Sequence, residues 1–210
     1  NNQGTTIANG KYLVFMNNDV QGISGWMEAF EDTFEHDETI GIQGAKLLYP
    51  NEKIQHAGIV WGPVPELNNM NLHYHIHLLE DGEDPKVNLS KEYQMVTGAL
   101  LAIRKELFHE VGGFDEKYYF GHEDLDLCMK VREKGYKVWY NHKASAYHYE
   151  SMTKKDVGME KFERFFKSEE SYDKANHEYF LSKWSDKIEV DAERHLSNKS
   201  ESISTKSATD

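Results

Sequence analysis

Three groups of polar side chains in this sequence are of the types that hold a divalent metal and move a proton. In chain order they are Asn17, Asn18 and Asp19, then Glu123, Asp124 and Asp126, and finally His148. One carboxylate and one imidazole, completed by water and a diphosphate, form a ligand set that suits Mg²⁺ or Mn²⁺. A further carboxylate could accept the proton of an attacking hydroxyl.

Each of these groups also has an ordinary structural explanation. An Asn-Asn-Asp stretch after a strand is often a turn, in which the side chains bind local amides. Glu123 and Asp124 could simply complement the dipole of a helix that starts there, and His148 could be a satisfied structural histidine. The case for chemistry therefore rests on the three groups occurring together in one order.

The elements that must position these groups are those of an α/β fold. Residues 12–16, YLVFM, are apolar on both faces, as in a central strand of a covered parallel sheet. Trp26, Phe30 and Phe34 recur at spacings of four and predict an amphipathic helix. Ligands of open α/β sheets bind at the carboxyl ends of the strands, and Asp19 stands at such a place.

The rest of the chain continues the alternation of strands and helices. The pattern predicts two strands around a Pro50-Asn51 turn, an irregular segment over 62–92, a strand over 95–103, a helix from about Glu123 to Gly135, a strand over 137–140 and a charged helical segment over 154–184. After about residue 189 the chain has too little apolar surface to fold, and a disordered tail is expected.

Two other features attract attention but predict no chemistry. His73, His75 and His77 would share one face of a strand, as metal ligands can. No cysteine or acidic ligand at a fitting spacing accompanies them, so a second metal site is not expected. Cys128 lies three residues beyond Leu125 and is expected to be a buried helix residue rather than a nucleophile.

Composition limits the kind of protein. The 210 residues include 24 Lys and Arg against 36 Asp and Glu, a net charge of −12 that argues against a nucleic-acid partner. A single cysteine excludes a disulfide framework and favours a reducing, cytoplasmic location. No apolar run is long enough to span a bilayer.

The order of the motifs resembles that of the family-two glycosyltransferases of the GT-A fold, especially the bacterial rhamnosyltransferase-like branch of surface polysaccharide synthesis. The matching stretches are ANGKYLVFMNNDV, GWMEAF, IGIQGAKLLYPNEKIQHAGIVWG, VTGALLAIRKELFHEVGGFDEKYYFGHEDLDLCMKVREKGYKVWY and AYHYES. The resemblance implies an α/β GT-A fold with a mixed, mostly parallel sheet flanked by helices. It assigns residues 1–152 to the transferase domain, 153–188 to a helical extension and 189–210 to the tail.

The resemblance also implies roles on the donor side. NND takes the place of the family's D-x-D motif, so Asp19 would hold a divalent metal, Mn²⁺ or Mg²⁺, on the diphosphate of a nucleotide-sugar donor. Asn17 and Asn18 would contact the donor, although Asn17 brings no charge where many relatives have a first Asp. His148 matches a histidine that serves as a further metal ligand.

On the acceptor side, HEDLD matches the motif that supplies the general base. Asp124 would be that base, with Glu123 and Asp126 orienting or binding the acceptor and Thr97 and Gly98 close to it. A base at a helix start is expected to have a lowered pKa. The implied reaction is an inverting transfer to a saccharide or lipid-linked acceptor, in the cytoplasm or at the inner face of the cytoplasmic membrane.

The family's sheet begins with strands that contact the nucleoside, and no counterpart precedes Asn1. We therefore expect the domain to lack its N-terminal part, and the 210 residues alone to bind sugar nucleotide poorly. Two rival hypotheses remain. One is a non-catalytic remnant that binds carbohydrate or protein, and the other is a nucleotidyltransferase, which would want a Gly-rich basic phosphate loop that we do not find.

Overall fold

A computed structural model describes residues 1–119, 121–149 and 172–197. In chain order its elements are α1 (Asn2–Thr5), β1 (Tyr12–Met16), β2 (Val20–Gly22), α2 (Trp26–His36), β3 (Ile40–Leu48), β4 (Ile54–His56), β5 (Ile59–Val64), η1 (Pro65–Leu67), β6 (Met70–His75), β7 (Lys91–Tyr93), β8 (Leu100–Arg104), α3 (Lys105–Glu110), α4 (Glu123–Glu133), β9 (Lys137–His148), α6 (Tyr172–Trp184) and α7 (Ala192–Leu196).

The main sheet is mixed, as expected, with the order β1-β8-β3-β9-β2, and with β4 beside β3 and β7 beside β9. Only β3 and β9 pair in parallel within it, so the expectation of a mostly parallel sheet is wrong. Strands β1, β3 and β9 do run in one direction, but β8 runs against them between β1 and β3. Because β8 is apolar on both faces, its sequence could not distinguish the two directions.

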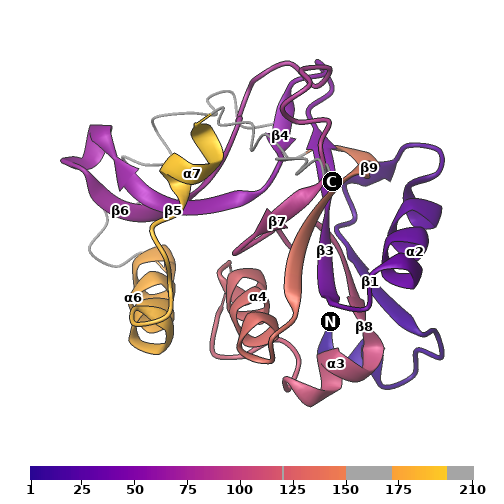
Figure 1. Ribbon diagram of the computed structural model, residues 1–210. Helices are drawn as coiled ribbons and strands as arrows, with labels where there is room; N and C mark the ends of the chain where they lie inside the picture. Colours follow the sequence, from indigo (N-terminus) through magenta and orange to yellow (C-terminus); the bar gives the residue numbers. More distant parts are fainter. Residues whose placement is uncertain (120, 150–171, 198–210) are drawn as a thin grey trace, which may run out of the picture.

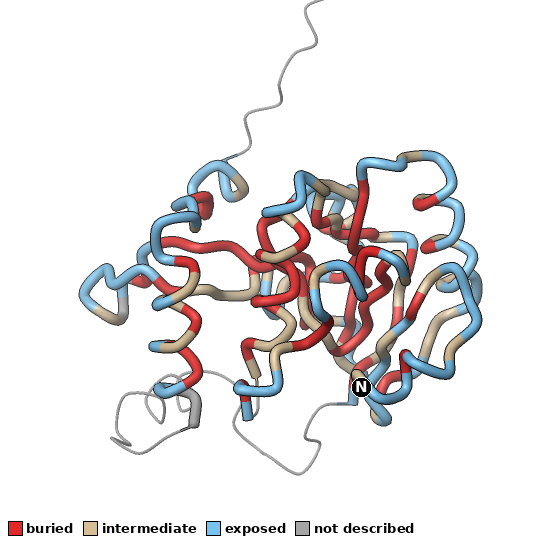
Figure 2. Tube along the Cα trace, turned by 90° about the horizontal axis from the view of Figure 1, so that it is seen from below, coloured by how far each residue is buried: buried red, intermediate tan, exposed pale blue. Residues whose placement is uncertain are grey.

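Helices cover both faces of this sheet (Figure 1). On one face α2 packs Phe30 and Phe34 against small and aliphatic residues, including Leu100 and Ala102 of β8. On the other face α3 and α4 pack against the alternate positions Leu101 and Ile103. Many residues of the strands are buried, whereas exposed residues are concentrated in the outer loops and on the outer faces of the helices (Figure 2).

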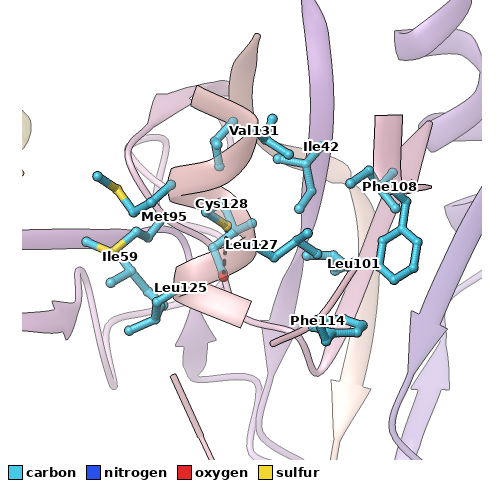
Figure 3. Close-up of a cluster of buried hydrophobic side chains, with 14 of the residues drawn as sticks. Ile42, Ile59, Met95, Leu101, Phe108, Phe114, Leu125, Leu127, Cys128 and Val131 are labelled. Carbon is cyan, nitrogen blue, oxygen red and sulfur yellow. Dashed lines mark hydrogen bonds between the residues drawn. The ribbon is translucent and has the colours of Figure 1, made fainter. Parts of the chain in front are cut away.

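Helix α4 is held in place by its apolar side. Figure 3 shows Leu127, Cys128 and Val131 of this helix in the same cluster as Ile42 of β3 and Leu101 of β8. The Cys128 thiol is fully buried and donates to the Val96 carbonyl at 3.7 Å. Cys128 is thus a buried helix residue, as its spacing predicted.

The segment predicted to be irregular contains a hairpin. Strand β6 pairs antiparallel with β5 from Ile59↔His75 to Val64↔Met70, and this two-stranded sheet projects away from the main sheet (Figure 1). The sequence of β6 is polar and lacks a strict alternation, so its periodicity gave no strand signal. Among the described helices, none combines the length and the apolar character that crossing a membrane would require.

The predicted tail boundary at residue 189 is also wrong for the part that the structure describes. Residues 189–197 include α7, and Ala192 is 2% exposed against Gly62 of β5. The Trp61 amide donates a hydrogen bond to Asp191 Oδ1 at 2.8 Å, and the Asp191 amide donates one to the Trp61 carbonyl. Of the predicted helical segment, 172–184 is α6, while 154–171 and the tail beyond 197 lie outside the described residues.

Candidate active site

Asn17, Asn18, Asp19 and His148 lie at one edge of the sheet, where β1, β3 and β9 end at Met16, Leu48 and His148; we call this the carboxyl edge. Directly after β1, the Asn17 amide donates to the Ala99 carbonyl at 2.9 Å. A turn closed by the Val20 amide and the Asn17 carbonyl, 3.2 Å apart, then leads into β2. The side chains of Asn17 and Asn18 are exposed on this turn.

Strand pairing brings Asp19 and His148 together although 129 positions separate them. Val20 is the register partner of His148, and the Tyr149 amide donates to the Asp19 carbonyl at 2.9 Å. As a result, His148 Nε2 lies 3.1 Å from Asp19 Oδ1. The side chain of His148 is 7% exposed and that of Asp19 is 41% exposed, so the pair opens to solvent on the carboxylate side.

A third residue, Gln55 of β4, orients the imidazole. The other ring nitrogen of His148, Nδ1, lies 2.5 Å from Gln55 Oε1, and because an amide oxygen only accepts, Nδ1 must donate. In the neutral ring Nε2 then carries the lone pair and points at the carboxylate. This arrangement fits a divalent cation, since adjacent ligands of an octahedral ion with bonds of about 2.1 Å lie about 3.0 Å apart.

Gln55 is a site residue that the sequence reasoning missed. It lies on a three-residue strand, 5% exposed, between Ile54 and His56, which are both fully buried. A buried side-chain amide needs a hydrogen-bond partner. That was the available signal, but the partner is 93 residues away and could not be read from the sequence.

Asp124 stands at the start of α4 and is fixed by backbone amides. The strand predicted over 95–103 begins only at Leu100, and the preceding residues form a loop that meets α4. In this loop the Gly98 amide donates to Asp124 Oδ2 at 2.6 Å, while the Leu125 amide donates to Oδ1 at 2.9 Å. A Cβ on residue 98 would lie 3.0 Å from the Asp124 Cβ, so the close approach needs glycine.

The pKa of Asp124 differs from the expectation. Burial, followed by the charge of Glu123, raises the pKa of Asp124 to about 6, despite the opposing hydrogen bonds from Gly98 and Leu125. The predicted lowering by the helix start is therefore wrong, because desolvation of the carboxylate outweighs the dipole and the amides here. Asp124 is still ionised at neutral pH, and its pKa is close to the range in which a general base works best.

The two neighbouring acids have different environments. Glu123 is half-buried, and its Oε2 is buried without a hydrogen-bond partner among the described residues. Asp126 is fully buried and forms ion pairs with Lys130, at 3.0 Å, and with Lys183. It also accepts the Trp184 indole N–H at 2.8 Å. The expected acceptor-binding role of Asp126 does not fit this position, because its oxygens are occupied inside the contact between α4 and α6.

Short contacts connect the base to the metal-ligand pair. Asp124 binds Gly98, the next residue Ala99 accepts the Asn17 amide, and Asp19 follows two residues later beside His148. Thr97 lies in the same loop, with its hydroxyl 3.4 Å from the Ala99 amide. A pocket of about 340 Å³ lies elsewhere, lined by Glu92, Tyr93, Gln94, Arg132, Glu189, Arg194 and His195, and it shares no residue with this group.

The chain is similar to known proteins both in sequence and in fold. The sequence profile of a family described as the N-terminal domain of galactosyltransferase matches residues 83–156, which include the Gly98 loop, the start of α4 and His148. GalNAc-T7, solved with UDP, GalNAc and Mn²⁺, superposes with a TM-score of 0.62 at 15% identity, over 89% of this chain and 34% of that one. At that identity the match concerns the fold.

Two curated relatives come from bacteria. The O-antigen biosynthesis protein RfbC of Myxococcus xanthus is 28% identical over 74% of this chain and 12% of its own length. The N-acetylglucosaminyl-diphospho-decaprenol L-rhamnosyltransferase of Mycobacterium tuberculosis is 28% identical over 67% of this chain and 47% of its own length. The chain thus spans less than half of either relative.

The mixed sheet with helices on both faces and the matches above define a nucleotide-sugar transferase fold of the GT-A type. The chain therefore has the GT-A fold, and parts of its sequence are similar to glycosyltransferases.

Proposed function

We propose that the carboxyl edge is the catalytic edge of an inverting, metal-dependent glycosyltransferase. The donor is a nucleoside diphosphate sugar, and the acceptor is a saccharide or lipid-linked hydroxyl of cell-surface polysaccharide synthesis. The observation that carries the proposal is the contact of Asp19 with His148, connected through Asn17, Ala99 and Gly98 to the fixed carboxylate of Asp124. The names of the bacterial relatives support the substrate class.

Asp124 is the proposed general base. As the acceptor oxygen bonds to the anomeric carbon, its O–H bond breaks and the proton passes to the Asp124 carboxylate, while the bond from the anomeric carbon to the diphosphate breaks. The amides of Gly98 and Leu125 hold the two carboxylate oxygens in place, so the base does not have to be ordered during the reaction. Glu123 keeps the basicity of Asp124 up through its negative charge.

Asp19 and His148 are the proposed metal ligands, with Gln55 holding the imidazole. A divalent ion at this place supplies charge neutralisation to the departing diphosphate. The exposed amides of Asn17 and Asn18 are proposed to bind hydroxyl or phosphate oxygens of the donor. Thr97 is the proposed acceptor contact. The proposed role of Gly98 is to hold the Asp124 carboxylate, and that of Asp126 is to stabilise the contact between α4 and α6 rather than to bind substrate.

The experiment is a titration of the 210-residue chain with Mn²⁺. Binding is monitored as the loss of the free-ion signal in electron paramagnetic resonance. Asp19→Asn and His148→Asn each remove a proposed ligand and are expected to weaken binding by at least about tenfold. Asp32→Asn, an exposed carboxylate on α2, is the matched control and should bind as the wild type does. Equal Mn²⁺ affinity in all four proteins would contradict the proposed ligands.

Activity is measured as nucleoside diphosphate release from a panel of sugar nucleotides. Turnover that requires Mn²⁺ or Mg²⁺ and that falls in Asp19→Asn supports the transferase. If the chain does not bind the metal, the remaining hypothesis of a non-catalytic carbohydrate- or protein-binding module takes its place. A lipid-linked acceptor would place the reaction at the inner face of the cytoplasmic membrane.

A further inference from the structure

Three histidines outside the metal-ligand pair converge from separate parts of the chain: His73 on β6, His122 directly before α4, and His177 on α6. One ring nitrogen of each lies within 4.8 Å of the other two. The ring centroids of His73 and His122 are 4.7 Å apart, and that of His177 lies 5.8 Å from His122 and 6.1 Å from His73.

This group is not the one that the sequence offered. Of the three histidines in the HYHIH stretch, His75 turns to His56, with 3.3 Å between their Nδ1 atoms, and His77 binds Glu80 at 3.0 Å. Only His73 joins the convergent group. Its two partners come from segments about 50 and 100 residues further on, so the spacing of ligands in the sequence carried no signal.

The surroundings of the three rings are largely closed. His122 is 8% exposed and His177 is 9% exposed. Trp61 stacks on His177 with an interplanar angle of 16°, and Phe180 packs on His122 with 5.8 Å between the ring centroids. The rings therefore meet in a space screened from water, where a polar nitrogen without a partner is costly.

One nitrogen in this space has no such partner. His122 Nε2 is buried and accepts or donates no hydrogen bond among the described residues. The backbone of His122 also has a φ of +72°, a left-handed conformation that is uncommon for a residue with a side chain. The chain thus holds His122 in an unfavourable backbone conformation while its ring remains incompletely bonded, which is a frequent property of residues that serve a ligand.

We propose that His73, His122 and His177 form a second metal site, for a borderline transition metal of which Zn²⁺ is the representative. Neutral imidazoles are good ligands for Zn²⁺, Co²⁺, Ni²⁺ and Cu²⁺, whereas Mg²⁺ and Mn²⁺ prefer ligand sets that contain oxygen. Burial lowers the pKa of His122 to about 4 and also lowers that of His177, which favours the neutral, metal-binding form of the rings. Three protein ligands leave one tetrahedral position for water.

Binding requires a small closure of the group. Ligand nitrogens around a tetrahedral ion with bonds of about 2.0–2.1 Å lie about 3.3 Å apart. All three nitrogens lie within 4.8 Å of one another, so any pair must approach by at most about 1.5 Å, which rotations of the imidazole side chains can provide. Such adjustments are smaller than the backbone changes that would be needed to build a site from residues that do not already meet.

The consequence is structural. The ion would tie the hairpin β5–β6, the start of α4 and helix α6 together, three segments that lie on the same side of the main sheet (Figure 1). His122 precedes Glu123 and Asp124 directly, so the site would fix the residue next to the proposed base. The role is that of a clamp, and it does not depend on whether the carboxyl edge transfers sugar.

The test uses the 210-residue chain, purified without a polyhistidine tag and freed of metal with a chelator. Isothermal titration with ZnCl₂ and the visible absorption of added Co²⁺ report binding and tetrahedral geometry. The wild type is expected to bind one equivalent. His73→Asn and His177→Asn each remove one of three ligands, and each should weaken binding by at least about 100-fold.

His109→Asn is the matched control, because His109 is exposed on α3 and does not belong to the group. It should bind Zn²⁺ as the wild type does. Circular dichroism melting with chelator present checks that every variant folds, and added Zn²⁺ should raise the melting temperature of the wild type and of His109→Asn only. Absence of stoichiometric binding, or unchanged binding in folded His73→Asn and His177→Asn, would overturn the proposal.

Discussion

The position of Asp124 at the start of a helix was predicted from the sequence, but the direction of its pKa shift was not. A carboxylate at a helix start is stabilised by the dipole, yet burial raises the pKa of Asp124 to about 6. The charge of Glu123 adds to this effect, and the hydrogen bond from the Gly98 amide opposes it. Burial of this kind depends on tertiary contacts, and the sequence alone contains no measure of it.

Asp124→Asn tests the proposed base. An amide cannot take the proton, so we expect kcat to fall by at least about 100-fold while Mn²⁺ affinity is retained. In the wild type, kcat should rise with pH as Asp124 loses its proton, with an apparent pKa of about 6. The measurement is nucleoside diphosphate release against pH, and an Asn variant with the wild-type rate and profile would exclude Asp124 as the base.

Gly98→Ala tests whether the position of the carboxylate matters. The new Cβ would lie 3.0 Å from the Asp124 Cβ, so the loop or the acid must shift. We expect a 10- to 100-fold lower kcat, roughly the effect of a misplaced catalytic group. Gly4→Ala is the control, because nothing lies within 4 Å of a Cβ there, and it should keep the wild-type rate. Equal rates in both variants would show that the close approach of Gly98 to Asp124 is not needed for catalysis.

At the scale of elements, the acidic residues in the first turn of α4 have two different roles. Its first residues face the carboxyl edge, while Asp126 turns inward to Lys130, Lys183 and Trp184 and fastens α6. The acidic HEDLD stretch is therefore divided between chemistry and structure. Spacing along a helix could indicate the division, but the partner Trp184 lies 58 residues away.

Asp126→Asn is expected to destabilise the fold. It leaves two lysines without their buried counter-charge, a change that costs about 3 kcal/mol in comparable buried pairs. Urea denaturation measures the free energy of unfolding, and Asp32→Asn on the exposed face of α2 should leave that free energy unchanged. A stable Asp126→Asn with impaired acceptor binding would instead restore the acceptor role to Asp126.

The elements that could be predicted are those whose side chains repeat with a clear period. Residues 12–16 form β1, the Trp26, Phe30 and Phe34 series forms α2, and the predicted helix start at Glu123 is the first residue of α4. Strand β6 and helix α7 could not be predicted, because β6 is polar and α7 is five residues long. Their stability comes from pairing with β5 and from the Asp191 contacts with Trp61, both of which are long-range.

At the scale of the whole molecule, the sheet gathers residues that are distant in sequence onto one edge. The contact of Asp19 with His148 follows from the pairing of β2 with β9, and the Asn17 contact with Ala99 follows from that of β1 with β8. The candidate residues of this edge could be named from the sequence, but the ligand-orienting role of Gln55 could not. The fold, rather than any single motif, makes the site.

The raised pKa of Asp124 also affects the stability of the whole chain. The folded state binds the proton of the Asp124 carboxyl group more tightly than the unfolded state does, so protonation of Asp124 stabilises the folded state. This stabilisation is fully present below the unfolded pKa of about 3.9 and is lost as pH rises through about 6. The wild type should therefore lose up to about 3 kcal/mol relative to Asp124→Asn between pH 4 and pH 7.5. Denaturation of both proteins across this range measures the difference, and a pH-independent difference would contradict the shift.

The most direct test of the central claim is Mn²⁺-induced broadening of amide resonances in the ¹⁵N-labelled chain. If Asp19 and His148 hold the ion beside the base, the amides of Asn18, Asp19 and Tyr149 should broaden first, and those of Gly98 and Ala99 next. Residues of α7 should remain sharp at the same Mn²⁺ concentration. Broadening centred elsewhere, or none at all, would contradict a single metal-dependent catalytic edge.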